Sequence, residues 1–138
     1  DLHSFPTRRS SDLFVSTPYL DFDRLRKIHE MLPETPLVLH GASSVLKEFV
    51  DRCNQYGGEI PGAQGVPEDM IREAVKWGVC KVNIDTDLRL AMTAEIRRIF
   101  KESPSEFDPR KYLGPGREAI TRMVRHKIKD VLNSSDKR

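Results

Sequence analysis

Residues 37–44 read Leu37-Val38-Leu39-His40-Gly41-Ala42-Ser43-Ser44, a short apolar strand followed by a histidine and a turn of small residues. Because a helix is expected next, this turn brings an imidazole and free backbone N–H groups to one edge of a sheet. A second stretch repeats the pattern and reads Val79-Cys80-Lys81-Val82-Asn83-Ile84-Asp85-Thr86-Asp87. Two such strand ends side by side predict a site for an anionic, oxygen-rich ligand, with or without a metal.

The spacing of apolar residues predicts helices around these strands. The helices are expected over residues 21–32, 43–56, 67–78, 86–103 and 117–132, and residues 107–116 are expected as a structured loop. Alternating strands and helices are typical of parallel βαβ units with right-handed crossovers. Two parallel strands do not form a stable sheet alone, so we expect the C-terminal end of a larger α/β protein.

Several side chains have expected places in these helices. Asp21 is the N-cap candidate of the first helix, Ser43 or Ser44 that of the second, and Thr86 or Asp87 that of the fourth. Pro67 is expected as the first residue of its helix. The last helix is expected to bury one stripe, formed by Ile120, Met123 or Val124, Ile128 and Val131.

The chain divides into three expected segments. Residues 1–13 show neither helical nor strand periodicity and are interpreted as a non-native or disordered head. Residues 14–132 form the domain, and residues 133–138 form a polar tail that we expect to fray.

Composition limits the classes of function. A net charge of +2 gives no case for nucleic acid, although residues 110–138 contain nine Lys or Arg against three Asp or Glu. We interpret that excess as a solvated helix face rather than a nucleic-acid surface. Cys53 and Cys80 are expected as buried free thiols of a reducing compartment. No apolar run approaches the roughly 20 residues of a membrane span, and no secretory signal is visible, so a cytoplasmic location is expected.

The candidate chemistry lies at the two strand ends, and each residue has a structural alternative. His40 is either a hydrogen-bonded structural histidine or a metal ligand, and one histidine cannot hold zinc without ligands from elsewhere. Asn83 could hydrogen-bond a substrate hydroxyl or an enediolate oxygen. Asp85 and Thr86 either cap a helix or offer phosphate-binding groups. Arg89 and Arg110 are either phosphate clamps or surface charges.

Four segments together resemble the C-terminal part of class II fructose-bisphosphate aldolase, from about residue 16 to residue 132. They are His40-Gly41-Ala42-Ser43-Ser44, Gly62-Ala63-Gln64-Gly65-Val66-Pro67, Lys81-Val82-Asn83-Ile84-Asp85-Thr86-Asp87-Leu88-Arg89 and Phe107-Asp108-Pro109-Arg110-Lys111-Tyr112-Leu113. The resemblance implies an incomplete (β/α)8 TIM barrel, in which residues 37–39 and 79–84 are the last two strands with their flanking helices.

The same resemblance implies roles for individual residues. His40 matches the last of three zinc-binding histidines, and Asn83 matches the residue beside the enediolate. The residues matching the site of one substrate phosphate are Gly41, Ser43, Asp85 and Thr86. Arg89 matches a contact to the other phosphate, and Arg110 matches an arginine that reaches that phosphate across a dimer interface.

By this resemblance, the reaction is a zinc-dependent cleavage of fructose 1,6-bisphosphate to dihydroxyacetone phosphate and glyceraldehyde 3-phosphate in a homodimer or larger oligomer. The family's catalytic aspartate and other zinc histidines would lie upstream of Phe14, so we expect the chain alone to be inactive and aggregated or molten. A monovalent cation site would be only partly present. The alternatives are a tagatose-bisphosphate aldolase and a non-catalytic module for phosphate binding or dimerisation.

Overall fold

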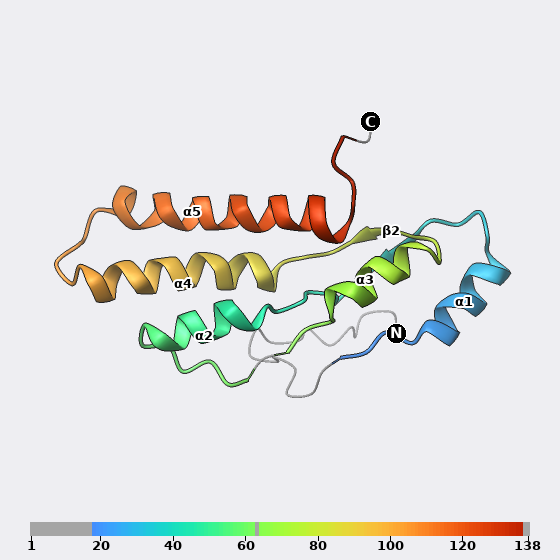
Figure 1. The fold of residues 1–138 in the computed structure, drawn as a ribbon, viewed down its shortest axis with the longest axis horizontal. Helices are drawn as coiled ribbons and strands as arrows, with labels where there is room; N and C mark the ends of the chain where they lie inside the picture. The colour runs from blue at the N-terminus through green and yellow to red at the C-terminus, as the bar shows by residue number, and fades with distance from the viewer. Residues whose placement is uncertain (1–17, 63, 137–138) are drawn as a thin grey trace, which may run out of the picture.

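The computed structural model describes residues 18–62 and 64–136 of the chain. Its elements follow in the order α1 (Phe22–Met31), β1 (Leu37–Leu39), α2 (Lys47–Gln55), α3 (Glu68–Val75), β2 (Val79–Val82), α4 (Thr86–Glu102), α5 (Pro109–His126) and the π-helix η1 (Lys127–Val131). The expected α/β class is confirmed. Helices α4 and α5 lie side by side along the long axis with α2 next to α4, and the sheet, α3 and α1 occupy the other end (Figure 1).

The sheet of the described residues consists of two parallel strands, as the alternation of elements predicted. Leu37 pairs with Val79 and Leu39 pairs with Val82, with an irregularity after Leu37. The ladder continues past β2, because Asn83 N–H donates to the Leu39 carbonyl at 3.0 Å. The strand β2 itself ends at Val82, two residues before the expected boundary at residue 84. Since parallel strands end at the same edge, the residues after β1 and β2 meet there.

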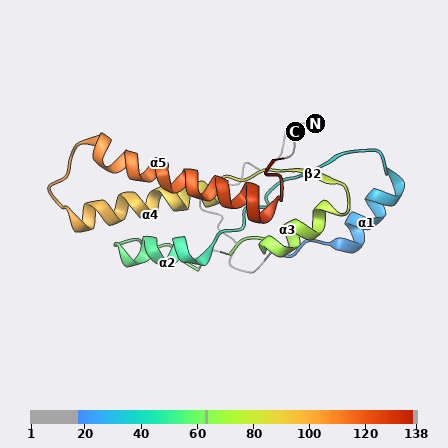
Figure 2. The same ribbon diagram turned by 45° about the horizontal axis from the view of Figure 1, so that its top comes forward.

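Three apolar clusters form the core and pack the carboxyl edge of the sheet against the helices. One cluster joins α2 to α4 around Cys53 and Leu90. A second packs Ala42, in the turn after β1, against Val66, Ile71 and Val131 of distant segments. A third lies between α4 and α5, with Ala91, Ala119 and Met123. Figure 2 shows the same arrangement from a second direction, with α2 still against α4. The turn after β1 and the start of α4 are thus parts of one packed body.

The prediction of a loop over residues 107–116 is wrong, because α5 begins at Pro109. Asp108 caps this helix by accepting a hydrogen bond from Arg110 N–H at 3.0 Å, and Pro109 occupies the first helical position, where its missing N–H costs nothing. Pro115 lies inside the helix and removes only one internal bond. Gly116 is buried where a Cβ would lie 3.1 Å from Met92 of α4. The glycine therefore serves close helix packing and not a turn.

Burial departs from the sequence-based expectation at the last helix and at β2. The buried stripe runs through Ala119, Met123, Lys127 and Val131. Ile128 was expected inside but is 41% exposed, and of the two alternatives Met123 is the buried one, since Val124 is 38% exposed. Cys80 is an exposed thiol, because one side of the short sheet is uncovered at this position, whereas Cys53 is buried as expected. Among the described residues, no helix combines the length and the apolar character that crossing a bilayer requires.

Candidate active site

Two loops meet at the carboxyl edge of the sheet, and we call them the strand-end rim: residues 40–43 after β1 and residues 83–86 after β2. The Asn83 side-chain amide donates to Nδ1 of His40 at 2.8 Å. This bond joins two exposed polar side chains that are 43 residues apart in sequence. The structure thereby brings together the predicted metal ligand and the predicted catalytic residue.

The imidazole of His40 has one nitrogen committed to Asn83. Because the amide nitrogen donates to Nδ1, the neutral ring carries its proton on Nε2 and offers no free lone pair. A half-turn of the Asn83 amide would let its oxygen accept from Nδ1–H and free Nε2 for a metal. Asn83 thus controls which nitrogen of His40 is available.

Ser43 lies at the N-terminus of α4. Its Oγ accepts hydrogen bonds from the backbone N–H groups of Asp85 and Thr86, each at 3.3 Å. These are the first N–H groups of a 17-residue helix, whose dipole favours negative charge at this end. Gly41 has φ of +66° with open space around it, so a ligand can approach the backbone closely. The site therefore has the features of an anion site, and four of its predicted phosphate-binding residues are side by side.

The two predicted arginines have different positions. Arg89 lies at the rim and forms a bidentate ion pair with Asp85, with Nε at 2.9 Å and a terminal nitrogen at 2.8 Å from the carboxylate oxygens. Arg110 lies at the opposite end of the α4–α5 pair, about 25 Å away by the length of α4 (Figure 1). It is paired with Asp108, whose pKa this contact lowers. The described chain does not bring Arg110 to its own rim.

Several helix-cap predictions for residues at or near the rim are wrong. Helix α2 begins only at Lys47, after Leu46, so neither Ser43 nor Ser44 caps it. The N-cap position of α4 belongs to Asp85, and Asp87 is fully buried in the first turn. Pro67 precedes its helix as the N-cap residue rather than opening it. Ser44 instead donates to the Asp87 carboxylate, and Ser43 accepts from the N–H groups of Asp85 and Thr86.

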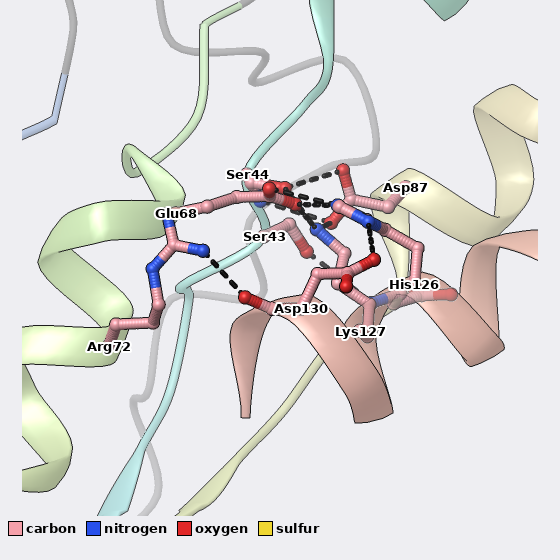
Figure 3. Close-up of polar contacts among 9 residues, drawn as sticks. Ser43, Ser44, Glu68, Arg72, Asp87, His126, Lys127 and Asp130 are labelled. Carbon is pink, nitrogen blue, oxygen red and sulfur yellow. Dashed lines mark hydrogen bonds and ion pairs between the residues drawn. The ribbon is translucent and has the colours of Figure 1, made fainter. Parts of the chain in front are cut away.

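Behind the rim lies a buried charged cluster that sequence reasoning did not predict, and we call it the Lys127 network: Ser44, Glu68, Asp87 and Lys127 (Figure 3). Lys127 Nζ donates to Glu68 at 2.6 Å and to the Ser44 hydroxyl, and lies 3.4 Å from Asp87. Asp87 accepts from Ser44 N–H at 3.0 Å and from Ser44 Oγ at 3.1 Å. The network joins the turn after β1, α3, α4 and η1.

One sequence signal could have revealed this network. Lys127 follows Met123 and precedes Val131 by four residues each, so it occupies the apolar stripe of the last helix. A lysine in such a stripe requires a buried anionic partner. The partner itself could not be read from the sequence, because Asp87 also fits a helix cap.

His126 extends the network toward solvent. Its Nε2 lies 2.9 Å from Glu68 and its Nδ1 lies 3.0 Å from Asp130. Burial alone would lower the pKa of His126, but the two carboxylates outweigh it and raise the pKa above its usual value. Burial alone would raise the pKa of Glu68, but hydrogen bonds from Lys127 and His126 lower it overall. Both groups are therefore stabilised in their charged forms.

A third segment, residues 65–66, packs against the backbone of the strand-end rim. Val66 N–H donates to the Ser43 carbonyl at 3.1 Å. Gly65 packs so tightly that an added Cβ would lie 2.2 Å from both the Ser43 carbonyl oxygen and the Ser44 carbonyl carbon. The Ser43–Ser44 backbone is thus held between residues 65–66 and the first turn of α4.

The described residues do not complete a metal site. Over residues 18–62 and 64–136, no three side chains of His, Cys, Asp or Glu converge in a geometry that could hold an ion. With the Asn83 amide turned, His40 would offer one nitrogen ligand, whereas zinc in proteins needs at least three. The residues present fit one ligand position of a zinc site and not the full ligand set.

Comparisons with known proteins agree with one another. A family model described as "Fructose-bisphosphate aldolase class-II" matches residues 11–59 and 60–137. The fructose-bisphosphate aldolase of Treponema pallidum is 50% identical over 127 residues, which are 92% of this chain and 38% of that protein. That of Giardia intestinalis is 54% identical over 80% of the chain and 34% of that protein, and that of Thermus caldophilus is 49% identical over 80% and 36%. The chain thus spans about a third of the length of these relatives.

Proposed function

This chain belongs to the class-II fructose-bisphosphate aldolase family, and from that membership we propose that it forms the phosphate-binding part of a lyase that cleaves fructose 1,6-bisphosphate. The products would be dihydroxyacetone phosphate and glyceraldehyde 3-phosphate. We also propose that β1 and β2 are the last two strands of a (β/α)8 barrel, which places the rim at the face where barrel enzymes carry their active sites.

The observation that carries the proposal is the position of Ser43 on the first N–H groups of α4. The N–H groups of Asp85 and Thr86 already donate to Ser43 Oγ, so a phosphate oxygen at this end would accept the Ser43 hydroxyl hydrogen and would lie in the positive field of the helix N-terminus. Since Ser43 Oγ accepts in both bonds, its own hydrogen stays available for the phosphate. The open approach to Gly41 lets an oxygen reach the backbone of the turn. The whole arrangement suits a phosphate dianion better than a neutral ligand.

The reaction centre would lie beside this phosphate site. His40 would supply one ligand to a zinc ion completed by residues outside the described ones, and the zinc, when bound, would polarise the ketone carbonyl. Asn83 would hold the His40 ring and could donate to the enediolate oxygen left after the C3–C4 bond breaks. The chain's own contribution is therefore to bind and orient the substrate, and no proton transfer is assigned to it.

The second phosphate of the substrate would be bound by arginine. Arg89 is already at the rim and would exchange Asp85 for the phosphate, with the same bidentate geometry. Arg110 is 89% exposed at the far end of the α4–α5 pair, so it could reach a phosphate only in another copy. This arrangement requires a homodimer or a larger oligomer.

A non-catalytic module is the second candidate function, because the described residues do not bring three metal ligands together. A non-catalytic module would bind phosphate at the rim without cleaving a bisphosphate. Tagatose 1,6-bisphosphate is an alternative substrate, since it differs from fructose 1,6-bisphosphate at one hydroxyl and carries the same phosphates.

A chimera tests these proposals. The 127 matching residues of the Treponema pallidum aldolase are replaced by those of this chain, and cleavage of both bisphosphates is measured with zinc present. We expect a higher kcat/KM for fructose 1,6-bisphosphate. A chimera that folds and binds inorganic phosphate but cleaves neither substrate would favour the non-catalytic module.

Matched variants locate the phosphate site. Ser43→Ala should raise KM about tenfold or more, because the hydroxyl that would donate to the phosphate is lost and the turn after β1 is no longer bonded to the N–H groups of Asp85 and Thr86. The control Ser105→Ala removes an exposed hydroxyl between α4 and α5 and should change nothing. Arg89→Met and Arg24→Met form a second pair, since each arginine is exposed and paired with a helix-capping aspartate. Equal changes in KM within a pair would contradict the assignment of Ser43 or Arg89 to phosphate binding.

A further inference from the structure

Lys127 is the one lysine among the described residues that is almost fully buried, with 3% of its surface exposed. We propose that Lys127 is a positioning residue for phosphate binding, which holds Asp87 and Ser44 and thereby fixes Ser43 on the first turn of α4. This inference rests on the proposed function, because it concerns the affinity of the same site. Figure 3 shows Lys127, Ser44 and Asp87 converging beside Ser43.

The first step is that Lys127 cannot contact a ligand itself. Its ammonium group has three N–H donors and faces three oxygen partners, on Glu68, Ser44 and Asp87. With all three directions occupied and the side chain buried, no donor points to solvent. Any effect of Lys127 on a bound phosphate therefore passes through its partners.

The second step concerns Asp87, which has no solvent exposure. Its two carboxylate oxygens accept from Ser44 N–H and from the Ser44 hydroxyl. A buried carboxylate without a nearby cation takes up a proton or draws in water. Either change would alter the acceptors that hold Ser44, so the charge on Lys127 determines the position of Ser44.

The third step connects Ser44 to the rim. Ser43 is the adjacent residue, and both of its hydrogen bonds to the α4 N–H groups are 3.3 Å long. Because these lengths are beyond the usual range for N–H to oxygen bonds, a shift of a few tenths of an ångström would break them. Gly65 and Val66 hold the opposite side of the Ser43–Ser44 backbone. Loss of the Lys127 contact should therefore displace Ser43 away from α4.

The experiment uses the active chimera. Inorganic phosphate is titrated into the chimera and followed by the amide NMR signals of Ser44 and Thr86. In the chimera, KM, kcat and the inhibition constant of inorganic phosphate are measured well below each variant's melting temperature. The variants are Lys127→Met, Lys127→Arg and the control Lys76→Met, an exposed lysine paired with Glu73.

We expect Lys127→Met to weaken phosphate inhibition and to raise KM about tenfold, with a smaller change in kcat. Lys127→Arg should restore most of the affinity because it keeps the charge, and Lys76→Met should have no effect. If Lys127→Met does not fold, a triple variant is measured in its place. This variant combines Lys127→Met with Glu68→Gln and Asp87→Asn, so that neither carboxylate is left without its lysine partner. Unchanged phosphate affinity in either folded variant would overturn the inference.

The Ser43→Ala variant separates this inference from the proposed function. If Ser43→Ala weakens phosphate binding and Lys127→Met does not, only the positioning role fails. If neither affects phosphate binding, the rim is not the phosphate site and both proposals fail.

Discussion

Replacing Gly65 with alanine should destabilise the fold strongly, whereas the same change at Gly62 should not. The two glycines belong to one loop, three residues apart, and differ in their surroundings. A Cβ on Gly65 would lie 2.2 Å from backbone atoms of Ser43 and Ser44, but a Cβ on Gly62 would meet nothing within 4 Å. Since carbon atoms in contact are normally about 3.5–4.0 Å apart, the backbone at residue 65 or 43 would have to move by more than about 1 Å.

The size of the effect follows from what this movement breaks. Overpacking a dense site costs about 1–3 kcal/mol, and the hydrogen bond from Val66 N–H to the Ser43 carbonyl contributes about 1 kcal/mol more. Because the obstacle is backbone and not a flexible side chain, we expect about 3 kcal/mol for Gly65→Ala. Gly62→Ala should stay within about 0.5 kcal/mol of the unsubstituted protein.

Urea denaturation of the chimera measures both free energies of unfolding, and the aldolase assay measures KM in parallel. Gly65→Ala should also raise KM, because the displaced Ser43 leaves the first turn of α4. Equal stability of the two variants, or a destabilised Gly65→Ala with unchanged KM, would refute the reasoning that residue 65 supports the rim.

Three further predictions concern charge, helix packing and folding. The stabilisation that protonated His126 gains from Glu68 and Asp130 should be present below pH 6.5 and lost as the pH rises through the raised pKa of His126. The stabilisation that ionised Glu68 contributes should be lost as the pH falls below 4.5. Urea denaturation should thus show the largest gap between the unsubstituted chimera and His126→Gln between about pH 4.5 and 6.5, and a gap that widens above pH 8 would contradict this. Gly114→Ala should change the free energy of unfolding by less than about 0.5 kcal/mol, because the better helix propensity of alanine is offset by the strain between its Cβ and the following Pro115. Gly116→Ala should destabilise more, because its Cβ would lie 3.1 Å from Met92, and the reverse order would disprove the packing role. The chain alone should give no cooperative thermal transition in circular dichroism, since its two-stranded sheet leaves Val38 47% exposed, and a sharp transition would show that it folds by itself.

Sequence signals that depend on neighbouring residues were sufficient for much of the fold. The strand before His40 and the Asp21 cap both follow from local rules, and both are observed. The meeting of His40 and Asn83 also follows, because two parallel strands must end at one edge. The first part of α5, residues 109–116, was predicted as a loop for a physical reason. Glycine and proline normally stop a helix, but packing on α4 outweighs their poor propensity.

The Lys127 network could not be predicted in full, because its members are distant in sequence. Ser44 and Asp87 both satisfy the rules for helix caps, and only the folded chain shows that they bond to each other. Local rules give a polar residue its default partner, whereas long-range contacts decide which partner it has.

The long sequence separations in this network have a consequence for the order of folding. Ser44 and Lys127 are 83 residues apart, and Glu68 and Lys127 are 59 apart, whereas α4 and α5 are consecutive helices. Closing long loops costs more entropy than pairing neighbours, so the helical hairpin can form early and the rim only near the end. A phosphate-bearing ligand that binds only the finished rim would stabilise the completed chain over every partly folded form. Ligand affinity would then also report how much of the chain has reached its final state.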